Sequence, residues 1–572
     1  MKCKKYKGAL FMRFDFYRGI SRAVVVALAL GSVVVMPSAY AAQSMSKPGE
    51  DINEQLPSSS ASVENVTPDA PVEHPEVKFT LKGISLDAPD LKLNKAKVSE
   101  ILAPALNREI TLSELNGYID QVTAYCRSHG YPAAAAYLPA QETSDGSVRV
   151  EVIPGRYGKV TIDNKSRLNE NIIKGFINNL TKGRVIETRP LETALYGISD
   201  LSGTKAVAVL SAGEEFGTSD LTVRVEDGKQ SNTVLYAENY GSKSTGRYRY
   251  GLQESLYDVG GTGGKLNVGT LISNDHLHNY YVNYEALVGR GGTTLGLGYS
   301  RMDYQVGGPL RATLHPEGNA DTISLFGSSP IYHETNRKLK FTYGYDYRDM
   351  QDEYGGGFGS QMNRDKHSHS VHAGIDGFEQ WRESGTLLDY DLTFRTGTLG
   401  FDSTTWGGKI LDKATNAEGR YTKAEANVTA VQALGHKTDV MVKLSGQRAS
   451  KNLDGSEQMY LGGANGVRAY AQAEGSGDDG WLGTMELRYY TDLPGLVLST
   501  YLDGGHVNVR HDGKSGGESL KGWGLGVSYT KPNDWFARFD YARRIGGIKG
   551  VTTMSDEQKD KSRMWFILGK IW

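Results

Sequence analysis

The chain has 572 residues, of which 39% are hydrophobic, and a mean hydropathy of −0.43. These values exclude a protein built from membrane-spanning helices, but they are compatible with a membrane β-barrel, in which only every second strand residue faces lipid. The formal net charge of −2 gives no reason to expect a nucleic-acid partner. Of the two cysteines, Cys3 lies in a segment that we expect to be removed, so the mature chain is predicted to contain no internal disulfide.

Residues 1–41 have the organisation of a secretory signal peptide. A basic stretch from Lys2 to Arg22 is followed by the apolar run Ala23–Met36 and by the small-residue sequence Ala39-Tyr40-Ala41. The apolar run of about 14 residues is too short for a transmembrane helix, which needs roughly 20. We therefore expect an exported chain, and a soluble secreted protein is one alternative at this point.

Residues 42–76 are predicted to form a linker. Five prolines interrupt this segment and Ser58–Ser62 is of low complexity, so the segment offers little that could build a core. A short plug helix around Asp51–Leu56 is the one regular element that the pattern allows.

Residues 77–154 and 155–228 are predicted to form two small α+β domains of the same topology. In the first, a strand at 77–81 and a helix at 95–102 precede a longer helix, whose start is marked by the capping box of Thr111 and Glu114. Cys126 lies on the apolar face of that helix, where we expect a buried and inert thiol. Strands at 133–138 and 148–153 complete the unit. The order strand, helix, helix, strand, strand then recurs from residue 157 onward.

Residues 229–572 are predicted to form a membrane β-barrel of about 16 antiparallel strands. Apolar and polar residues alternate most clearly at 534–542, where Trp535 and Phe539 face away from Arg538 and Asp540. Glycine-rich turns separate the alternating segments. A soluble β-sandwich with its apolar faces turned inward is the alternative.

The chain ends on an apolar strand. Phe566, Leu568 and Trp572 are predicted to face lipid in one row and to act as the terminal signal for barrel insertion. Lys570 interrupts this row, but its long side chain can reach the membrane interface.

Two short motifs give the chain a family resemblance. Gly466-Val467-Arg468-Ala469-Tyr470 lies in a glycine-rich stretch at 461–480, and Tyr501-Leu502-Asp503-Gly504-Gly505 lies on a later strand. Together with the two α+β units and the barrel, they make the chain resemble the outer-membrane transporters of two-partner secretion.

This haemolysin secretion/activation family belongs to the barrel-assembly superfamily, which joins periplasmic POTRA domains to a barrel. Its members carry Val-Arg-Gly-Tyr/Phe at the tip of a loop that folds into the barrel. They carry aromatic-x-Asp-x-Gly in the barrel wall. Here Ala469 replaces the glycine of the first motif.

The resemblance implies a salt bridge between Arg468 of the loop tip and Asp503 of the barrel wall. Leu498 and Leu502 share one strand face, so Asp503 is expected to point into the lumen, where Arg468 could reach it. In a wet lumen such a bridge contributes about 0.2–1 kcal/mol, and more if the loop excludes water. The alternative is that Arg468 is one more solvated loop arginine. The motif residues concerned are Val467, Arg468, Ala469 and Tyr470 in the loop, and Tyr501, Asp503 and Gly505 in the wall.

The resemblance also implies a function. It predicts a transporter in the outer membrane of a Gram-negative bacterium, whose POTRA-like units capture an unfolded exoprotein in the periplasm by β-augmentation. This partner, of the haemolysin, adhesin or toxin class, would pass through the barrel and fold outside. Outer-membrane lipids and the barrel-assembly machinery are the other partners that we expect. An insertase of the same superfamily and a passive porin-like channel are the alternatives.

No catalytic residue, cofactor or metal is predicted, and we expect no enzymatic activity. His367, His369 and His372 lie close together, but their spacing matches no metal-site signature. No nucleophile elbow and no acid–base pair can be recognised among the serines, histidines and carboxylates.

Overall fold

The computed structural model describes residues 63–65, 78–141, 146–201, 203–307, 315–355, 359–546 and 560–572. The predicted signal peptide at 1–41 and the predicted plug helix around Asp51–Leu56 lie outside these residues. None of the helices within the described ranges has the length and apolar character needed to cross a bilayer.

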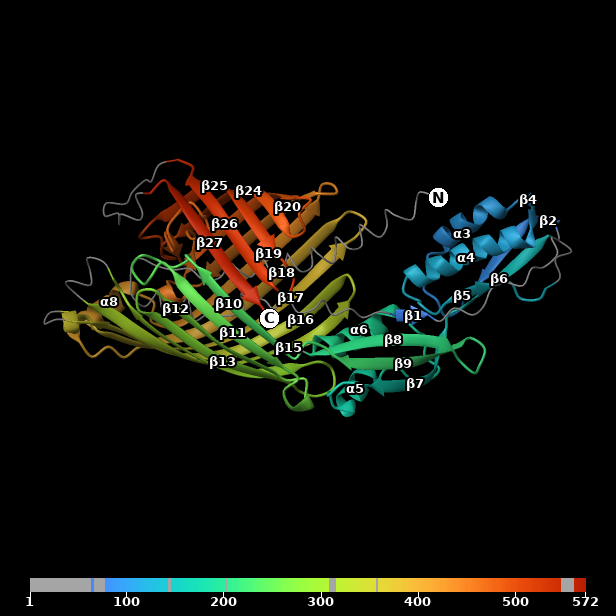
Figure 1. The fold of residues 1–572 in the computed structure, drawn as a ribbon, viewed down its shortest axis with the longest axis horizontal. Helices are drawn as coiled ribbons and strands as arrows, with labels where there is room; N and C mark the ends of the chain where they lie inside the picture. The colour runs from blue at the N-terminus through green and yellow to red at the C-terminus, as the bar shows by residue number, and fades with distance from the viewer. Residues whose placement is uncertain are drawn as a thin grey trace.

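The first α+β unit packs two helices on small sheets (Figure 1). Strand β6 pairs in parallel with β3 and antiparallel with β5, and β4, which the sequence did not predict, pairs with β2. The predicted capping box is confirmed, since Thr111 accepts a hydrogen bond from the Glu114 backbone N–H and Glu114 accepts one from that of Thr111. The predicted apolar face of this helix is buried and includes Cys126. The elements are β2 (Lys78–Leu81), β3 (Gly83–Asp87), α3 (Lys95–Leu102), η1 (Ala103–Ala105), β4 (Arg108–Thr111), α4 (Leu112–Ser128), β5 (Ala135–Tyr137) and β6 (Ser147–Ile153).

The second unit repeats the sheet topology of the first. Its last strand, β9, pairs in parallel with β7 and antiparallel with β8. A short strand, β1 (Val63–Asn65), joins β8 in parallel, so part of the segment predicted as a linker adds to this sheet. The other elements are β7 (Arg156–Asn164), α5 (Glu170–Ile177), α6 (Thr188–Asp200), β8 (Thr204–Ala212) and β9 (Thr218–Asp227).

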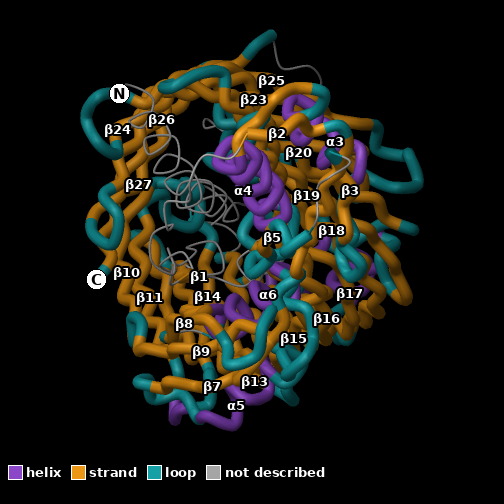
Figure 2. The backbone as a smooth tube through the Cα atoms, turned by 90° about the vertical axis from the view of Figure 1, so that its right-hand side faces the viewer, coloured by secondary structure: helices purple, strands orange, loops and turns teal. Residues whose placement is uncertain are grey.

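The C-terminal part is a closed antiparallel barrel, to which the described residues contribute sixteen strands (Figure 2). The predicted fold class is therefore confirmed. The strands are β10 (Ser231–Glu238), β11 (Arg249–Tyr257), β12 (Lys265–Ser273), β13 (Leu277–Leu287), β14 (Thr294–Gln305), β15 (Pro316–Glu334), β16 (Arg337–Tyr354), β17 (Arg364–Trp381), β18 (Thr386–Phe401), β19 (Gly419–Ala433), β20 (Thr438–Ala449), β23 (Asp479–Tyr490), β24 (Leu496–Asn508), β25 (Gly517–Thr530), β26 (Trp535–Arg544) and β27 (Ser562–Ile571).

The barrel wall is apolar outside and polar inside. Leu498 and Leu502 of β24 are exposed on the outer surface, whereas Tyr501 and Asp503 of the same strand are buried inside. This is the inverse of a soluble β-sandwich, whose apolar residues face inward, and it is the pattern of a membrane barrel. The β-sandwich alternative is therefore wrong.

The barrel closes where its first strand meets its last. Strands β10 and β27 are in register from Val234 opposite Ile571 to Glu238 opposite Ile567. Beyond Glu238 the pairing is continued by Asn239, whose backbone and side-chain amides donate hydrogen bonds to the carbonyls of Phe566 and Met564. We call this junction the seam.

A long loop, residues 450–478, connects β20 to β23 and turns back into the lumen. It contains η4 (Gly455–Glu457), β21 (Met459–Tyr460) and β22 (Ser476–Gly477). Leu461, Val467 and Ala469 of the loop are fully buried against inward-facing residues of the wall. The remaining short elements are η2 (Val259–Gly261), η3 (Gly359–Met362) and α8 (Trp406–Thr415).

Candidate functional site

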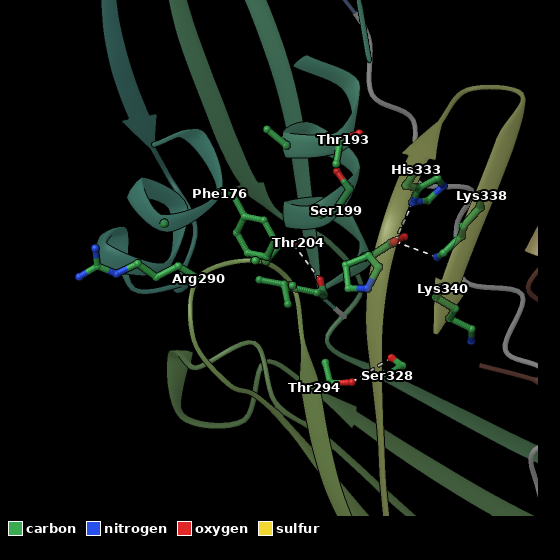
Figure 3. A pocket seen from close by; sticks show the side chains of 18 of the residues that line it. Phe176, Thr193, Ser199, Thr204, Arg290, Thr294, Ser328, His333, Lys338 and Lys340 are labelled. Carbon is green, nitrogen blue, oxygen red and sulfur yellow. Dashed lines mark hydrogen bonds and ion pairs between the residues drawn. The ribbon is translucent and has the colours of Figure 1, made fainter. Parts of the chain in front are cut away.

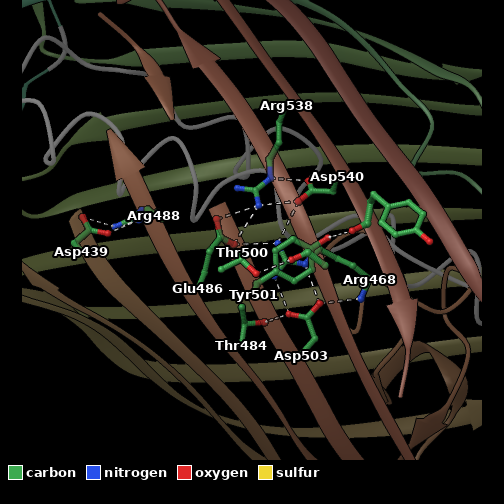
Figure 4. A network of polar contacts seen from close by, with 12 residues as sticks. Asp439, Arg468, Thr484, Glu486, Arg488, Thr500, Tyr501, Asp503, Arg538 and Asp540 are labelled. Atoms are coloured by element: carbon green, nitrogen blue, oxygen red, sulfur yellow. Dashed lines mark hydrogen bonds and ion pairs between the residues drawn. The ribbon is translucent and has the colours of Figure 1, made fainter. Parts of the chain in front are cut away.

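The loop tip is bound to the barrel wall by Arg468 and Asp503 (Figure 4). The guanidinium group donates from Nε to Oδ2 at 2.9 Å and from Nη2 to Oδ1 at 2.8 Å, and the backbone N–H of Arg468 also donates to Oδ2. Both side chains are buried, with 7% and 1% of their surface exposed. This two-pronged, buried geometry differs from the alternative of a solvated loop arginine. It places the pair in the range where removing one partner is strongly destabilising.

Two further carboxylates surround the guanidinium group. Glu486 of β23 lies 3.0 Å from Nη1 of Arg468, and Asp540 of β26 lies 3.5 Å from the same atom. Arg538 contacts both acids, at 3.1 Å and 2.7 Å. Two arginines therefore share three carboxylates, so that each buried charge has a partner of opposite sign.

Two aromatic rings complete the surroundings of the tip. The guanidinium carbon of Arg468 lies 3.2 Å from the centre of the Tyr501 ring, and that of Arg544 lies 4.1 Å from the centre of the Tyr470 ring. Such stacking favours arginine over lysine, because the planar guanidinium can lie on a ring while its N–H groups remain bonded to carboxylates. Both motif tyrosines thus contact an arginine.

Wall glycines provide the space that the loop occupies. A Cβ atom added at Gly505 would lie 2.7 Å from a methyl carbon of Leu461, and one added at Gly522 would lie 2.7 Å from the Cβ of Ala469. Ala469 is not among the described non-glycine residues with positive φ, so alanine fits at this position without backbone strain.

The barrel seam contributes a further contact to the loop tip. The indole Nε1 of Trp565, on β27, donates a hydrogen bond of 2.7 Å to the backbone carbonyl of Arg468. Trp565 is buried and packs edge-to-face against Tyr240, which follows β10. The loop tip therefore contacts β27 directly and is linked through Trp565 to Tyr240 on the other side of the seam.

Sequence reasoning brought Arg468 and Asp503 together but missed the other members of the network. Alternation placed Glu486, Arg538 and Asp540 on the polar faces of their strands. It gave no indication of how deep the loop tip would lie, and so did not identify these residues as its partners. Trp565 was missed for the same reason, since an inward tryptophan on the last strand has no motif of its own.

The residues of the last strand that were predicted to face lipid differ in their exposure. Leu568 and Trp572 are exposed on the outer face, whereas Phe566 is half-buried. Lys570 lies over the rings of Trp535 and Trp572 and is 3.5 Å from Asp534, at the periplasmic end of the wall. Its charge is therefore placed at the edge of the apolar surface, in agreement with the predicted snorkelling.

The side chains of His367, His369 and His372 do not point toward a common site. His367 and His369 share the outer face of β17, where His367 contacts Asp402 and His369 contacts the hydroxyl of Tyr345, while His372 points inward to Asp346. Within the described ranges, no three His, Cys, Asp or Glu side chains are grouped as a metal site.

The second α+β unit contacts the barrel at the turn between β15 and β16. Asp200, at the end of α6, lies 2.7 Å from Nδ1 of His333 and 2.8 Å from Nζ of Lys338. Burial alone would raise the pKa of Asp200, but Lys338 and His333 outweigh it and hold this pKa well below its ordinary value. A cavity of 720 Å³ lies at this joint (Figure 3), lined from both sides by residues that include Arg290 and Lys340.

A sixteen-stranded outer-membrane barrel with two small α+β units and an inward loop defines a class of polypeptide transporter. The chain matches the haemolysin secretion/activation protein family ShlB/FhaC/HecB over residues 217–529 and the ShlB-type POTRA domain over residues 79–155. The chain belongs to this family. It is an outer-membrane transporter of two-partner secretion, with its POTRA domains in the periplasm.

Individual relatives agree with this assignment. The chain is 26% identical over 506 residues to the heme/hemopexin transporter protein HuxB of Haemophilus influenzae, covering 86% of this chain and 87% of the relative. It is 23% identical to the outer membrane transporter CdiB of Dickeya dadantii, with 80% and 81% covered. The solved structure of CdiB from Escherichia coli has the same fold, with a TM-score of 0.63, 20% identity and coverage of 89% and 93%.

Proposed function

We propose that the loop is a plug that Arg468 locks in the lumen, and that export of the partner protein requires this lock to open and close. The observation that carries the proposal is the buried, two-pronged contact between Arg468 and Asp503, supported by Glu486 and Asp540. A loop held in this way occupies the space through which an extended polypeptide must pass. Export therefore requires the loop to leave its position, and sealing the membrane afterwards requires it to return.

The proposed division of labour follows the chain. Residues 1–41 direct export and are removed, and residues 42–76 form a linker with room for a short plug helix, from which Val63–Asn65 adds to the sheet of the second unit. Residues 77–154 and 155–228 receive the unfolded partner, and residues 229–572 conduct it. Within the described residues, the three-stranded sheet of the first unit ends in β3 and β5, and the four-stranded sheet of the second ends in β1 and β7. Such edge strands can pair with an extended client, which suits a protein that must be recognised before it folds.

The partner is proposed to be an exoprotein of the haemolysin, adhesin or toxin class. One relative carries the name heme/hemopexin transporter and another the name outer membrane transporter, so the names do not narrow the class of the partner further. Outer-membrane lipids would cover the exposed rows that include Leu498, Leu502 and Leu568. The barrel-assembly machinery would recognise the terminal strand through Phe566, Leu568 and Trp572. We propose no catalytic activity for the chain.

The test is to express the chain with the exoprotein encoded beside its gene and to measure that exoprotein in the medium. We expect secretion with the full chain, and none when residues 78–228 are deleted although the barrel still reaches the outer membrane. Unchanged physiological activity of the deleted form would support a passive porin. Loss of other barrel proteins from the membrane, with normal secretion, would support an insertase.

A further inference from the structure

The loop also contacts a second part of the barrel wall, formed by strands β16, β17, β19 and β20, well before its tip. Asp454 and Glu457, at the start and end of the short turn η4, are both buried although they carry charges. We call Asp454–Glu457 the stem of the loop. Ionised carboxylates are rarely buried without partners, so the stem must be matched by cations of the wall.

Glu457 binds two cations from different strands. One carboxylate oxygen lies 2.7 Å from Nη1 of Arg348 on β16, and the other lies 2.9 Å from Nζ of Lys423 on β19. The backbone carbonyl of Glu457 also accepts hydrogen bonds from Lys423 and from the side-chain amide of Gln447 on β20. Three strands of the wall therefore hold this one loop residue.

Asp454 is held by a third cation. Nζ of Lys366, on β17, lies 3.3 Å from both oxygens of Asp454 and 3.6 Å from Asp352 of the wall. The Lys366 side chain is completely buried. Asp454 also accepts a hydrogen bond from the backbone N–H of Ser456, which fixes the turn that presents Glu457.

The charges of the two contacts are reversed. At the tip, a cation of the loop, Arg468, lies among three acids of β23, β24 and β26. At the stem, two acids of the loop lie among three cations of β16, β17 and β19. A loop displaced so that its stem met the acidic part of the wall would bury like charges against each other, which is strongly unfavourable.

We propose that the stem is a second, independent anchor of the loop, and that it keeps the loop in the lumen when the Arg468 lock opens. Asp454 and Glu457 act as positioning residues, with Arg348, Lys366 and Lys423 as their receptors. The tip can then swing aside while the stem stays bound, so the loop can return to a single position. This inference rests on the proposed role of the loop as a plug, but it concerns different residues and a different part of the wall.

The test measures channel opening by the purified full-length protein in planar lipid bilayers. Four forms are compared: wild type, Arg468→Ala, Glu457→Gln and the double variant. If the stem is a second anchor, Arg468→Ala alone leaves the channel largely closed, and the double variant raises the open fraction about tenfold or more above it. A charged hydrogen-bond contact shifts an equilibrium by roughly that factor.

The matched control is Glu425→Gln. Glu425 lies 3.0 Å from the same Lys423 but belongs to the wall strand β19 and not to the loop. Adding Glu425→Gln to Arg468→Ala is expected to leave the open fraction unchanged. A double variant with Glu457→Gln that opens no more than Arg468→Ala, or no more than this control, overturns the second anchor.

A second variant tests whether the effect of Glu457→Gln comes from a misfolded loop. Arg348→Gln removes the 2.7 Å contact from the wall side and leaves the loop sequence intact. It should also increase opening in the Arg468→Ala background, in preparations whose barrels show the normal heat-dependent shift in gel mobility. If Arg468→Ala secretes normally but both stem variants open the channel, the lock proposal fails while the stem anchor stands.

Discussion

The indole N–H of Trp565 donates a 2.7 Å hydrogen bond to the backbone carbonyl of Arg468, so the last strand of the barrel holds the tip of a loop 97 residues earlier in the chain. This contact joins the seam to the lock. Any displacement of the loop tip breaks a bond to the strand that closes the barrel. The state of the loop and the stability of the seam are therefore expected to change together.

Arg468→Ala is expected to abolish secretion or to impair it strongly. The substitution leaves Asp503 buried without its main cation, and losing one partner of such a pair costs about 3–5 kcal/mol. Arg468→Lys should restore secretion only in part, since an ammonium group cannot make the two-pronged contact or stack on Tyr501. The exoprotein in the medium is measured at equal surface levels of each variant. Arg448→Ala is the control, because Arg448 is exposed and lies 3.8 Å from Asp479. Normal export by Arg468→Ala would contradict the assigned role of Arg468.

Gly522→Ala is expected to displace the loop tip, because the new methyl group would lie 2.7 Å from the Cβ of Ala469. Adding Ala469→Gly removes the obstructing atom and should restore the wild-type position of the tip. If Gly522→Ala caused only a general defect in β25, a substitution in the loop would not be expected to reverse it. Hydrogen exchange of the loop tip, residues 466–470, is the measurement, and Gly446→Ala is the control, since the nearest neighbour of its new methyl group would be 3.7 Å away. Failure of Ala469→Gly to reverse the effect would argue against direct contact between these residues.

Trp565→Phe is expected to weaken the position of the loop while keeping an aromatic ring in the seam. It removes one neutral hydrogen bond, with a contribution of about 0.5–1.5 kcal/mol. In the Glu457→Gln background, in which the stem is weakened, the open fraction should therefore rise by a factor of roughly two to ten. Trp535→Phe serves for comparison, because Trp535 is exposed on the outer wall. Equal effects of the two substitutions would mean that the contact between Trp565 and Arg468 does not hold the loop.

Asp200→Asn is expected to loosen the joint between the second POTRA-type unit and the barrel. Because the pKa of Asp200 is held below its ordinary value, its contribution is present above about pH 4 and is lost only as the pH falls through the lowered pKa. The joint should therefore be insensitive to Asp200 ionisation near neutral pH. Hydrogen exchange in α6 and the β15–β16 turn measures the loosening.

Asp163→Asn is the control for the joint. Asp163 belongs to the same unit but is paired with Lys165 and Arg224 on its surface. If Asp200→Asn exchanges no faster than Asp163→Asn in α6, then Asp200 does not hold the two parts together.

The sequence pattern predicted the barrel, and the family resemblance of two motifs implied its central ion pair. Alternation of side chains fixed which face of β24 would carry Asp503, and the motif around Arg468 supplied its partner. Local patterns of this kind persist in the folded state because a strand residue cannot change faces without a shift of register.

Contacts between residues that lie far apart in the sequence could not be predicted. Asp200 and His333 are 133 residues apart, and neither lies in a recognisable pattern. Glu457 and Arg348 are 109 residues apart, and their contact could not be predicted for the same reason. Strand β4 was missed because it is only four residues long and lies between two helical segments.

The acidic pocket for Arg468 also sets an order of events during barrel assembly. Asp503, Glu486 and Asp540 come from three strands, and Trp565 comes from a fourth, so the pocket does not exist until β23 to β27 have paired. Before that point Arg468 has nothing to compensate the cost of leaving water. Docking of the loop tip is thus a late step, and a barrel that has not closed at its C-terminal end cannot lock the tip of its own plug.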